Sequence, residues 1–117
     1  MKSNSKAKLL RIFIGETDKH GQVNLYEKIV VEARKEGLAG ATVYRGIMGF
    51  GGNSIIHTAK ILRLSEDLPL VIEIVDTEEK INNFIPIVDK IFEEADAGGL
   101  ITMEAAEIIK YTPREKA

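Results

Sequence analysis

The sequence predicts one α+β domain built from two consecutive β-α-β units. Its 117 residues correspond to one domain, since single domains most often contain roughly 100–150 residues. β-rich segments start near residues 9, 41 and 70, and apolar residues recur at helical spacing after the first and the third of them. Gly98 and Gly99 then lead into a last β-rich segment. Strands and helices therefore follow the order β-α-β-β-α-β.

The composition narrows the classes of protein to which the chain can belong. Hydrophobic residues make up 44% and charged residues 29%, as in folded domains, and the formal net charge of -2 disfavours indiscriminate binding to nucleic acid. The absence of cysteine excludes disulfides, a thiol nucleophile, and cysteine-ligated zinc or iron–sulfur centres. No apolar run approaches the ~20 residues of a membrane-spanning helix, so we expect a cytoplasmic protein.

The first strand is expected after a polar N-terminus. Residues 1–8 are polar or small and include three lysines, which predicts a flexible N-terminal tail. Residues 9–117 then form the single domain. In residues 9–15 apolar side chains alternate, which predicts a strand with one face toward the core.

A helix and a second strand complete the first unit. Asn24 and Glu27 form a capping-box pattern, and apolar residues at helical spacing follow it. A helix over about residues 24–36 is expected, with Gly37 as its C-terminal stop. Residues 41–48 return to β character.

The second unit repeats this pattern. Residues 70–75 predict a strand, and Asp76 with Glu79 offers a second capping box at the start of the second helix. Pro86 falls inside this helix and lacks a backbone donor, so we expect a kink or a break near residues 82–84.

The element order indicates a ferredoxin-like βαββαβ sandwich. Its four-stranded antiparallel sheet carries two helices on one face, and the loop between strands 2 and 3, over residues 49–69, is unusually long. After the second helix, residues 100–103 and 107–111 are the expected pieces of the last strand. The strands carry apolar residues on both faces, namely Phe13, Val43 or Tyr44, Val71 or Ile72, and Ile74. The face without helices is therefore expected to associate with other copies.

Two glycine-rich segments are candidate anion sites. Residues 49–52 read GFGG directly after a strand, and glycine lets backbone N–H groups approach an anion closely. The spacing matches neither the dinucleotide-binding nor the P-loop motif, and an ordinary turn in which glycine adopts positive φ remains the alternative reading. Gly98 and Gly99 carry the same two readings.

Other polar residues give weaker indications. His20 is expected to be a solvated loop residue, whereas His57 lies in the long loop, where it can contact a ligand or partner. Arg45 and Lys110 are expected in strand-like segments near the glycines, where a cation can meet phosphate. Glu73 on a central strand argues against base stacking on the sheet, so no nucleic acid partner is expected.

Six phrases of the sequence, in order along the chain, resemble one family. They are IFIGE, LYEKIV, GLAGATVYRGIMGFG, IHTAKIL, LSEDLP and GLITMEAAEI. They are similar to the PII-like family called domain of unknown function 190, which is related to the PII nitrogen-regulatory signalling proteins. The resemblance covers about residues 9–111.

This resemblance implies a homotrimer with a nucleotide cleft between neighbouring subunits, at the base of the long loop. Thr42 corresponds to a residue that contacts adenine, Asn53 follows the loop-opening glycines, and Lys110 corresponds to a strand arginine. The implied ligand-binding residues are Thr42, Gly49, Phe50, Gly51, Gly52, Asn53, Gly98, Gly99 and Lys110. The resemblance implies no catalytic residue and no metal ligand.

One departure from the PII pattern bears on the ligand. PII proteins carry a lysine that meets the triphosphate, and this chain has Leu100 at that place. Loss of that charge weakens recognition of a triphosphate most, so AMP or ADP is expected over ATP. The nucleotide is then a regulatory ligand, and no cofactor is required.

The leading hypothesis is a non-enzymatic trimeric sensor that changes the conformation of residues 50–66 to engage a protein partner. A membrane-associated protein is among the candidate partners. Two other classes stay open: a small phosphate-handling enzyme, since ferredoxin-like folds include acylphosphatases, and a ligand-free trimeric scaffold like the CutA proteins.

Overall fold

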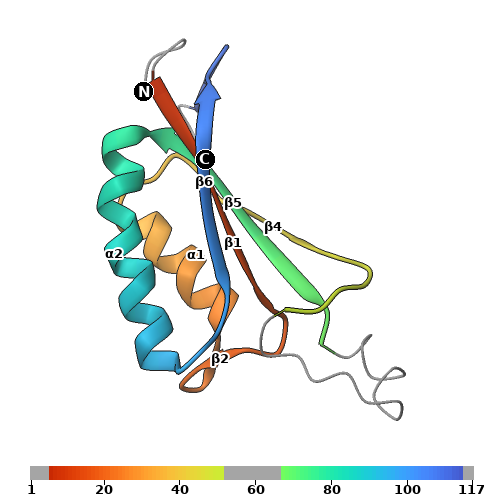
Figure 1. Ribbon diagram of the computed structural model, residues 1–117. Helices are drawn as coiled ribbons and strands as arrows, with labels where there is room; N and C mark the ends of the chain where they lie inside the picture. The colour runs from red at the N-terminus through yellow and green to blue at the C-terminus, as the bar shows by residue number, and fades with distance from the viewer. Residues whose placement is uncertain (1–5, 52–66, 115–117) are drawn as a thin grey trace.

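The computed structural model describes residues 6–51 and 67–114, and it contains one four-stranded sheet with both helices on one face (Figure 1). The elements are β1 (Lys6–Gly15), β2 (Lys19–His20), β3 (Val23–Asn24), α1 (Leu25–Lys35), β4 (Thr42–Arg45), β5 (Pro69–Thr77), α2 (Glu78–Ala95) and β6 (Leu100–Glu107). The sheet order is β4-β5-β1-β6, and all neighbouring strands are antiparallel. The ferredoxin-like fold predicted from the sequence is therefore confirmed.

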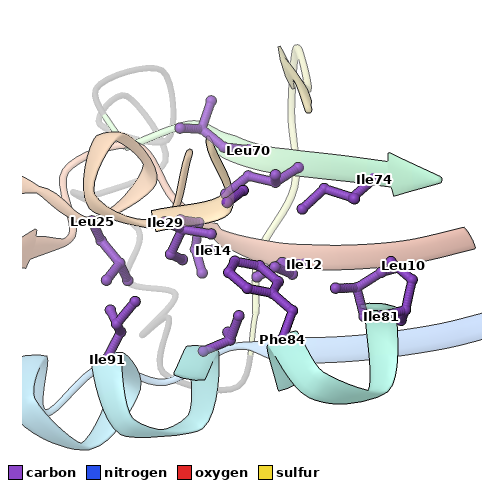
Figure 2. Packing of buried hydrophobic residues seen from close by; sticks show 13 residues of the cluster. Leu10, Ile12, Ile14, Leu25, Ile29, Leu70, Ile74, Ile81, Phe84 and Ile91 are labelled. Atoms are coloured by element: carbon purple, nitrogen blue, oxygen red, sulfur yellow. The ribbon is translucent and has the colours of Figure 1, made fainter. Parts of the chain in front are cut away.

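The hydrophobic core fills the space between the sheet and the two helices (Figure 2). Alternate side chains of the central strands point toward the helices, so that Leu10 lies opposite Ile74 and Ile12 opposite Ile72. Phe84 of α2, 1% exposed, packs into the same cluster. Each such side chain contributes about 1.5–3 kcal/mol by its burial, which fixes β1 and β5 at the centre of the sheet.

The second helix is continuous, so the predicted break near residues 82–84 is wrong. Pro86 and Asn82 are both exposed, and the carbonyl that loses its donor to Pro86 lies on the solvent side, where water can satisfy it. The expected N-cap is wrong by one residue, because the Thr77 side chain accepts a bond of 3.3 Å from Lys80 N. Among the described residues, neither helix is long and apolar enough to cross a membrane.

Asn24 is the N-cap residue of α1, as predicted, but it does not form the predicted capping box. Its side chain makes no hydrogen bond to the helix backbone; instead its Nδ2 donates to Glu27 Oε1 at 2.8 Å. At the other end, Gly37 adopts φ +79, and the N–H of Leu38 donates to Ala33 O at 3.1 Å. This is the glycine-terminated helix end that the sequence predicts.

Strand boundaries differ from the predicted ones most in β1, β4 and β6. β1 starts at Lys6, because its ladder with β6 extends to the pair Lys6 and Glu107, so Lys6–Lys8 belong to the sheet and not to the tail. β4 ends at Arg45, three residues before the expected end of the strand. β6 is one uninterrupted strand, and Lys110 lies beyond its end.

Candidate functional site

Both glycine-rich segments lie at the same end of the sheet. Arg45 of β4 pairs with Leu70 of β5, Gly15 of β1 pairs with Pro69, and Phe13 of β1 pairs with Leu100 of β6. Four strand termini therefore lie at the same end of the sheet, namely the ends of β1 and β4 and the starts of β5 and β6 (Figure 1). The glycine-rich segment after β4 and the Gly98–Gly99 turn before β6 both lie at this end.

Within one chain, the two segments adjoin different strands. β4 and β6 are the opposite outer strands, and three inter-strand spacings separate them by about 14 Å. Two copies placed with the β4 edge of one beside the β6 edge of the other would bring the two segments together.

The remaining predicted contacts are spread over the sheet. Thr42 is exposed and lies opposite Glu73, on the face without helices. Lys110 is exposed and lies past the far end of β6, away from Gly98 and Gly99. Phe50 is 71% exposed. Gly52, Asn53 and His57, with most of residues 50–66, lie outside the described residues.

The two ends of the long loop are anchored to β1 and to each other. Glu16 N donates to Leu68 O at 2.9 Å, and Gly46 N donates to Pro69 O at 2.7 Å. The guanidinium of Arg45, one of the two cations predicted to meet phosphate, pairs instead with the Glu16 carboxylate. These bonds make a fixed base from which Gly49 and the residues after it leave the sheet.

Close packing against Pro69, and not a positive φ, accounts for Gly46 and Gly49. A Cβ on Gly46 would lie 2.9 Å from Pro69 Cγ, and one on Gly49 would lie 3.0 Å from the same atom. A Cβ on Gly51 would meet no heavy atom within 4 Å. Among the described glycines, only Gly21 and Gly37 have positive φ. The reading of residues 49–51 as a positive-φ turn is therefore wrong.

Gly99 also has a packing role that the sequence did not show. A Cβ at this position would lie 2.6 Å from Phe92 Cε2 and 2.8 Å from the backbone oxygen of Phe13. Real Cβ atoms essentially never approach so closely. Only glycine fits at position 99, between α2 and β1. This close approach fixes the residue at which β6 begins.

A row of polar side chains crosses the uncovered face of the sheet. Arg11 Nε donates to Glu73 Oε2 at 2.8 Å, and Arg11 Nη1 donates to Glu104 Oε1 at 2.5 Å. Tyr44 Oη donates to Glu73 Oε2 at 2.7 Å. The hydrogen bonds from Arg11 and then Tyr44 hold the pKa of Glu73 below its ordinary value, and the bond to Glu73 raises the pKa of Tyr44.

Apolar side chains flank this polar row. Val75 is 39% exposed and Leu100 is 56% exposed, and Phe13 is half-buried. An exposed sheet face that combines apolar residues with a satisfied polar centre is typical of an interface between proteins. Sequence reasoning identified Phe13 but not Val75, Leu100 or the polar row.

A shallow hollow of about 220 Å³ lies at the outer edge of β4. It is lined by Glu16, Tyr26, Val43, Tyr44, Arg45 and Leu70. A second hollow of similar size continues along α1 past Val30 and Val31. Two tyrosines and aliphatic side chains at a strand edge give a surface on which a flat apolar ring can lie.

His20 belongs to a small hairpin, so its interpretation as a solvated loop residue is wrong. β2 pairs with β3, and Gly21 supplies the positive φ of +62 at the turn. His20 Nε2 lies 3.0 Å from Glu94 Oε1, near the end of α2. This hydrogen bond lowers the pKa of Glu94. No cluster of metal-ligating side chains occurs among the described residues.

Comparison with known proteins gives one family and close relatives in sequence. The profile of the family DUF190, described as "Uncharacterized ACR", matches residues 7–108. A UPF0166 protein of Methanocaldococcus jannaschii is 40% identical over 105 residues, which cover 90% of this chain and 94% of the relative. A UPF0166 protein of Aquifex aeolicus is 39% identical over 104 residues, with 89% and 94% covered.

Several solved structures that share the fold are described as PII-like proteins. CPII from Thiomonas intermedia K12, in a structure bound to ADP and bicarbonate, gives a TM-score of 0.65 at 17% identity and covers 90% of each chain. A protein from Thermus thermophilus, described as PII-like and signaling, gives 0.63 at 15% identity, with 92% of this chain and 94% of the other covered. At these identities the likeness shows the fold.

Proposed function

This chain belongs to the DUF190 family, and we propose that it is a PII-like sensor that binds an adenine nucleotide between the subunits of a homotrimer. AMP or ADP is preferred over ATP. Residues 50–66 then act on a protein partner in response to the nucleotide. The nucleotide is a signal and not a substrate.

The observation that carries this proposal is the separation of the two glycine segments on opposite outer strands. They share one end of the sheet but adjoin opposite outer strands, which lie about 14 Å apart, so a ligand between two copies can meet one segment of each. The anchored base at Glu16, Leu68 and Pro69 supports the same view, because it holds the exit of the long loop beside such a cleft. CPII, which has this fold, was solved with ADP.

The uncovered sheet face supports self-association. Both helices pack on the other face, and this one exposes Val75, Leu100 and half of the Tyr44 side chain. Monomers rarely leave large apolar patches in water. A closed ring of copies would cover this face and would place β4 of each copy near β6 of the next.

The position of Leu100 supports a ligand with few phosphates. Leu100 is 56% exposed at the start of β6, next to the Gly98–Gly99 turn. An aliphatic side chain there gives no favourable contact to a third phosphate and excludes water from its charge. The free energy of binding should therefore fall from ADP to ATP.

Titration calorimetry of the purified chain with AMP, ADP and ATP, alongside light scattering, tests the proposal. We expect a trimer mass and saturable binding of AMP or ADP, weaker binding of ATP, and no turnover of the bound nucleotide. Gly51→Val should lower nucleotide affinity without changing the trimer, because its side chain would occupy space that the ligand needs.

Met48→Val is the matched control for this variant. It places a β-branched side chain in the same exposed segment without replacing a glycine, and it should leave affinity unchanged. A monomer mass at micromolar concentration, or equal affinity in Gly51→Val and the wild type, would contradict the proposal.

A further inference from the structure

Asp76 is the one charged side chain that is buried among the residues the structure describes. It is 1% exposed and closes β5 on the face toward the helices. Its Oδ2 accepts the backbone N–H of Ala39 at 2.8 Å, and its Oδ1 accepts the N–H of Thr77 at 2.7 Å. A buried carboxylate is costly unless donors satisfy it, so the fold retains this group for the contacts that it makes.

The contact to Ala39 fixes the segment that joins α1 to β4. After the glycine turn at Gly37, Lys80 Nζ donates to Gly37 O at 3.1 Å, and two residues later Ala39 N donates to Asp76. Asp76 and Lys80, which we call the α2 clamp, therefore hold this segment from the start of α2. The helix N-terminus adds favourable potential for the carboxylate.

The α2 clamp lies directly before the predicted adenine contact. Thr42 follows Ala39 by three residues, which span at most about 10 Å of chain. β4 has only four residues and is an outer strand bound to β5 on one side. Pairing with β5 holds β4 along its length, and separate contacts hold the segments at its two ends. Gly46 N to Pro69 O holds one end, and the α2 clamp holds the other.

We infer that Asp76 is a positioning residue that sets the selectivity of the nucleotide site for adenine, acting through Ala39 on Thr42. This inference rests on the proposed function, because it assigns a role within the same site. Asp76 itself does not touch the ligand. Its carboxylate sets where the Thr42 hydroxyl can meet the edge of a base.

The chemistry of the clamp selects the substitution. Asp76→Asn keeps the shape of the side chain but offers one oxygen and one NH₂ group to two backbone donors. One N–H must then face another donor, which weakens the hold on Ala39. Lys80→Met removes the outer half of the clamp at an exposed position, so that variant folds even if Asp76→Asn is poorly stable. Asp89→Asn on the exposed face of α2 is the matched control.

Two measurements test the inference on the trimeric full chain. Hydrogen exchange should speed up at Ala39 and through β4 in Asp76→Asn, and to a smaller extent in Lys80→Met, while β1 stays protected. Calorimetry with ADP and GDP should show about a tenfold loss of ADP affinity in Asp76→Asn with GDP binding unchanged, so that base selectivity falls. Asp89→Asn should match the wild type in both.

The outcomes separate this inference from the proposed function. Equal loss of ADP and GDP affinity would mean a merely structural role and would overturn the inference. Unchanged exchange at Ala39, or a wild type that binds ADP and GDP equally, would overturn it as well. A wild type that binds no adenine nucleotide would refute the proposed function and, with it, the role of Asp76 in base selectivity.

Discussion

Replacing Gly99 by alanine tests whether packing or ligand contact accounts for this glycine. The added Cβ would lie 2.6 Å from Phe92 Cε2 and 2.8 Å from the backbone oxygen of Phe13. The Phe92 ring can turn aside at some cost, but the Phe13 oxygen belongs to a central strand and cannot. We therefore place the loss near the upper end of the overpacking range, at about 3 kcal/mol of unfolding free energy. For a domain of this size that lowers the unfolding midpoint by about 10 °C.

Thermal and urea unfolding at fixed protein concentration measure this loss, since the midpoint of an oligomer depends on concentration. Gly51→Ala is the control, and its unfolding free energy should stay within about 0.5 kcal/mol of the wild type. Gly99→Ala combined with Phe92→Leu should regain only part of the loss, because the clash with Phe13 O remains. A Gly99→Ala protein as stable as Gly51→Ala would refute the packing argument.

Two further predictions follow from the ionic contacts. The pKa of Glu73 is lowered in the folded chain, so its pairing with Arg11 stabilises the fold above the ordinary carboxylate pKa and is lost as pH falls through the lowered one. Arg11→Met should therefore be less stable than the wild type at neutral pH, and unfolding scans should show that difference closing as the pH falls below the ordinary carboxylate pKa. His20→Ala should speed hydrogen exchange in β2 and β3 and return the pKa of Glu94 toward its ordinary value; an unchanged Glu94 titration in NMR would argue against this contact.

Local patterns predicted the fold because each of its main elements is specified by neighbouring residues. Alternation in β1 identified its core face, and Gly37 marked the end of α1, where it adopts positive φ. The break predicted from Pro86 is absent because the carbonyl that loses its hydrogen bond lies on the solvent side of α2, where water can satisfy it. The helix start was placed at Asp76, whose carboxylate is instead used by Ala39, 37 residues earlier.

The candidate site was harder to predict, because its contacts join distant parts of the chain. Arg11 binds partners 62 and 93 residues away, and no local pattern pairs it with Glu73 and Glu104. Glycine identity alone also does not show why a glycine is present. Gly99 makes room for a ring and a backbone oxygen, whereas a side chain at Gly51 would meet no heavy atom within 4 Å.

A crystal structure of the full chain grown with ADP tests the central claim most directly. We expect ADP in a cleft between two copies, with adenine beside Thr42 and the phosphates between Gly49–Gly51 of one copy and Gly98–Gly99 of its neighbour. ADP bound within a single chain away from these segments, or no ADP at a saturating concentration, would contradict it.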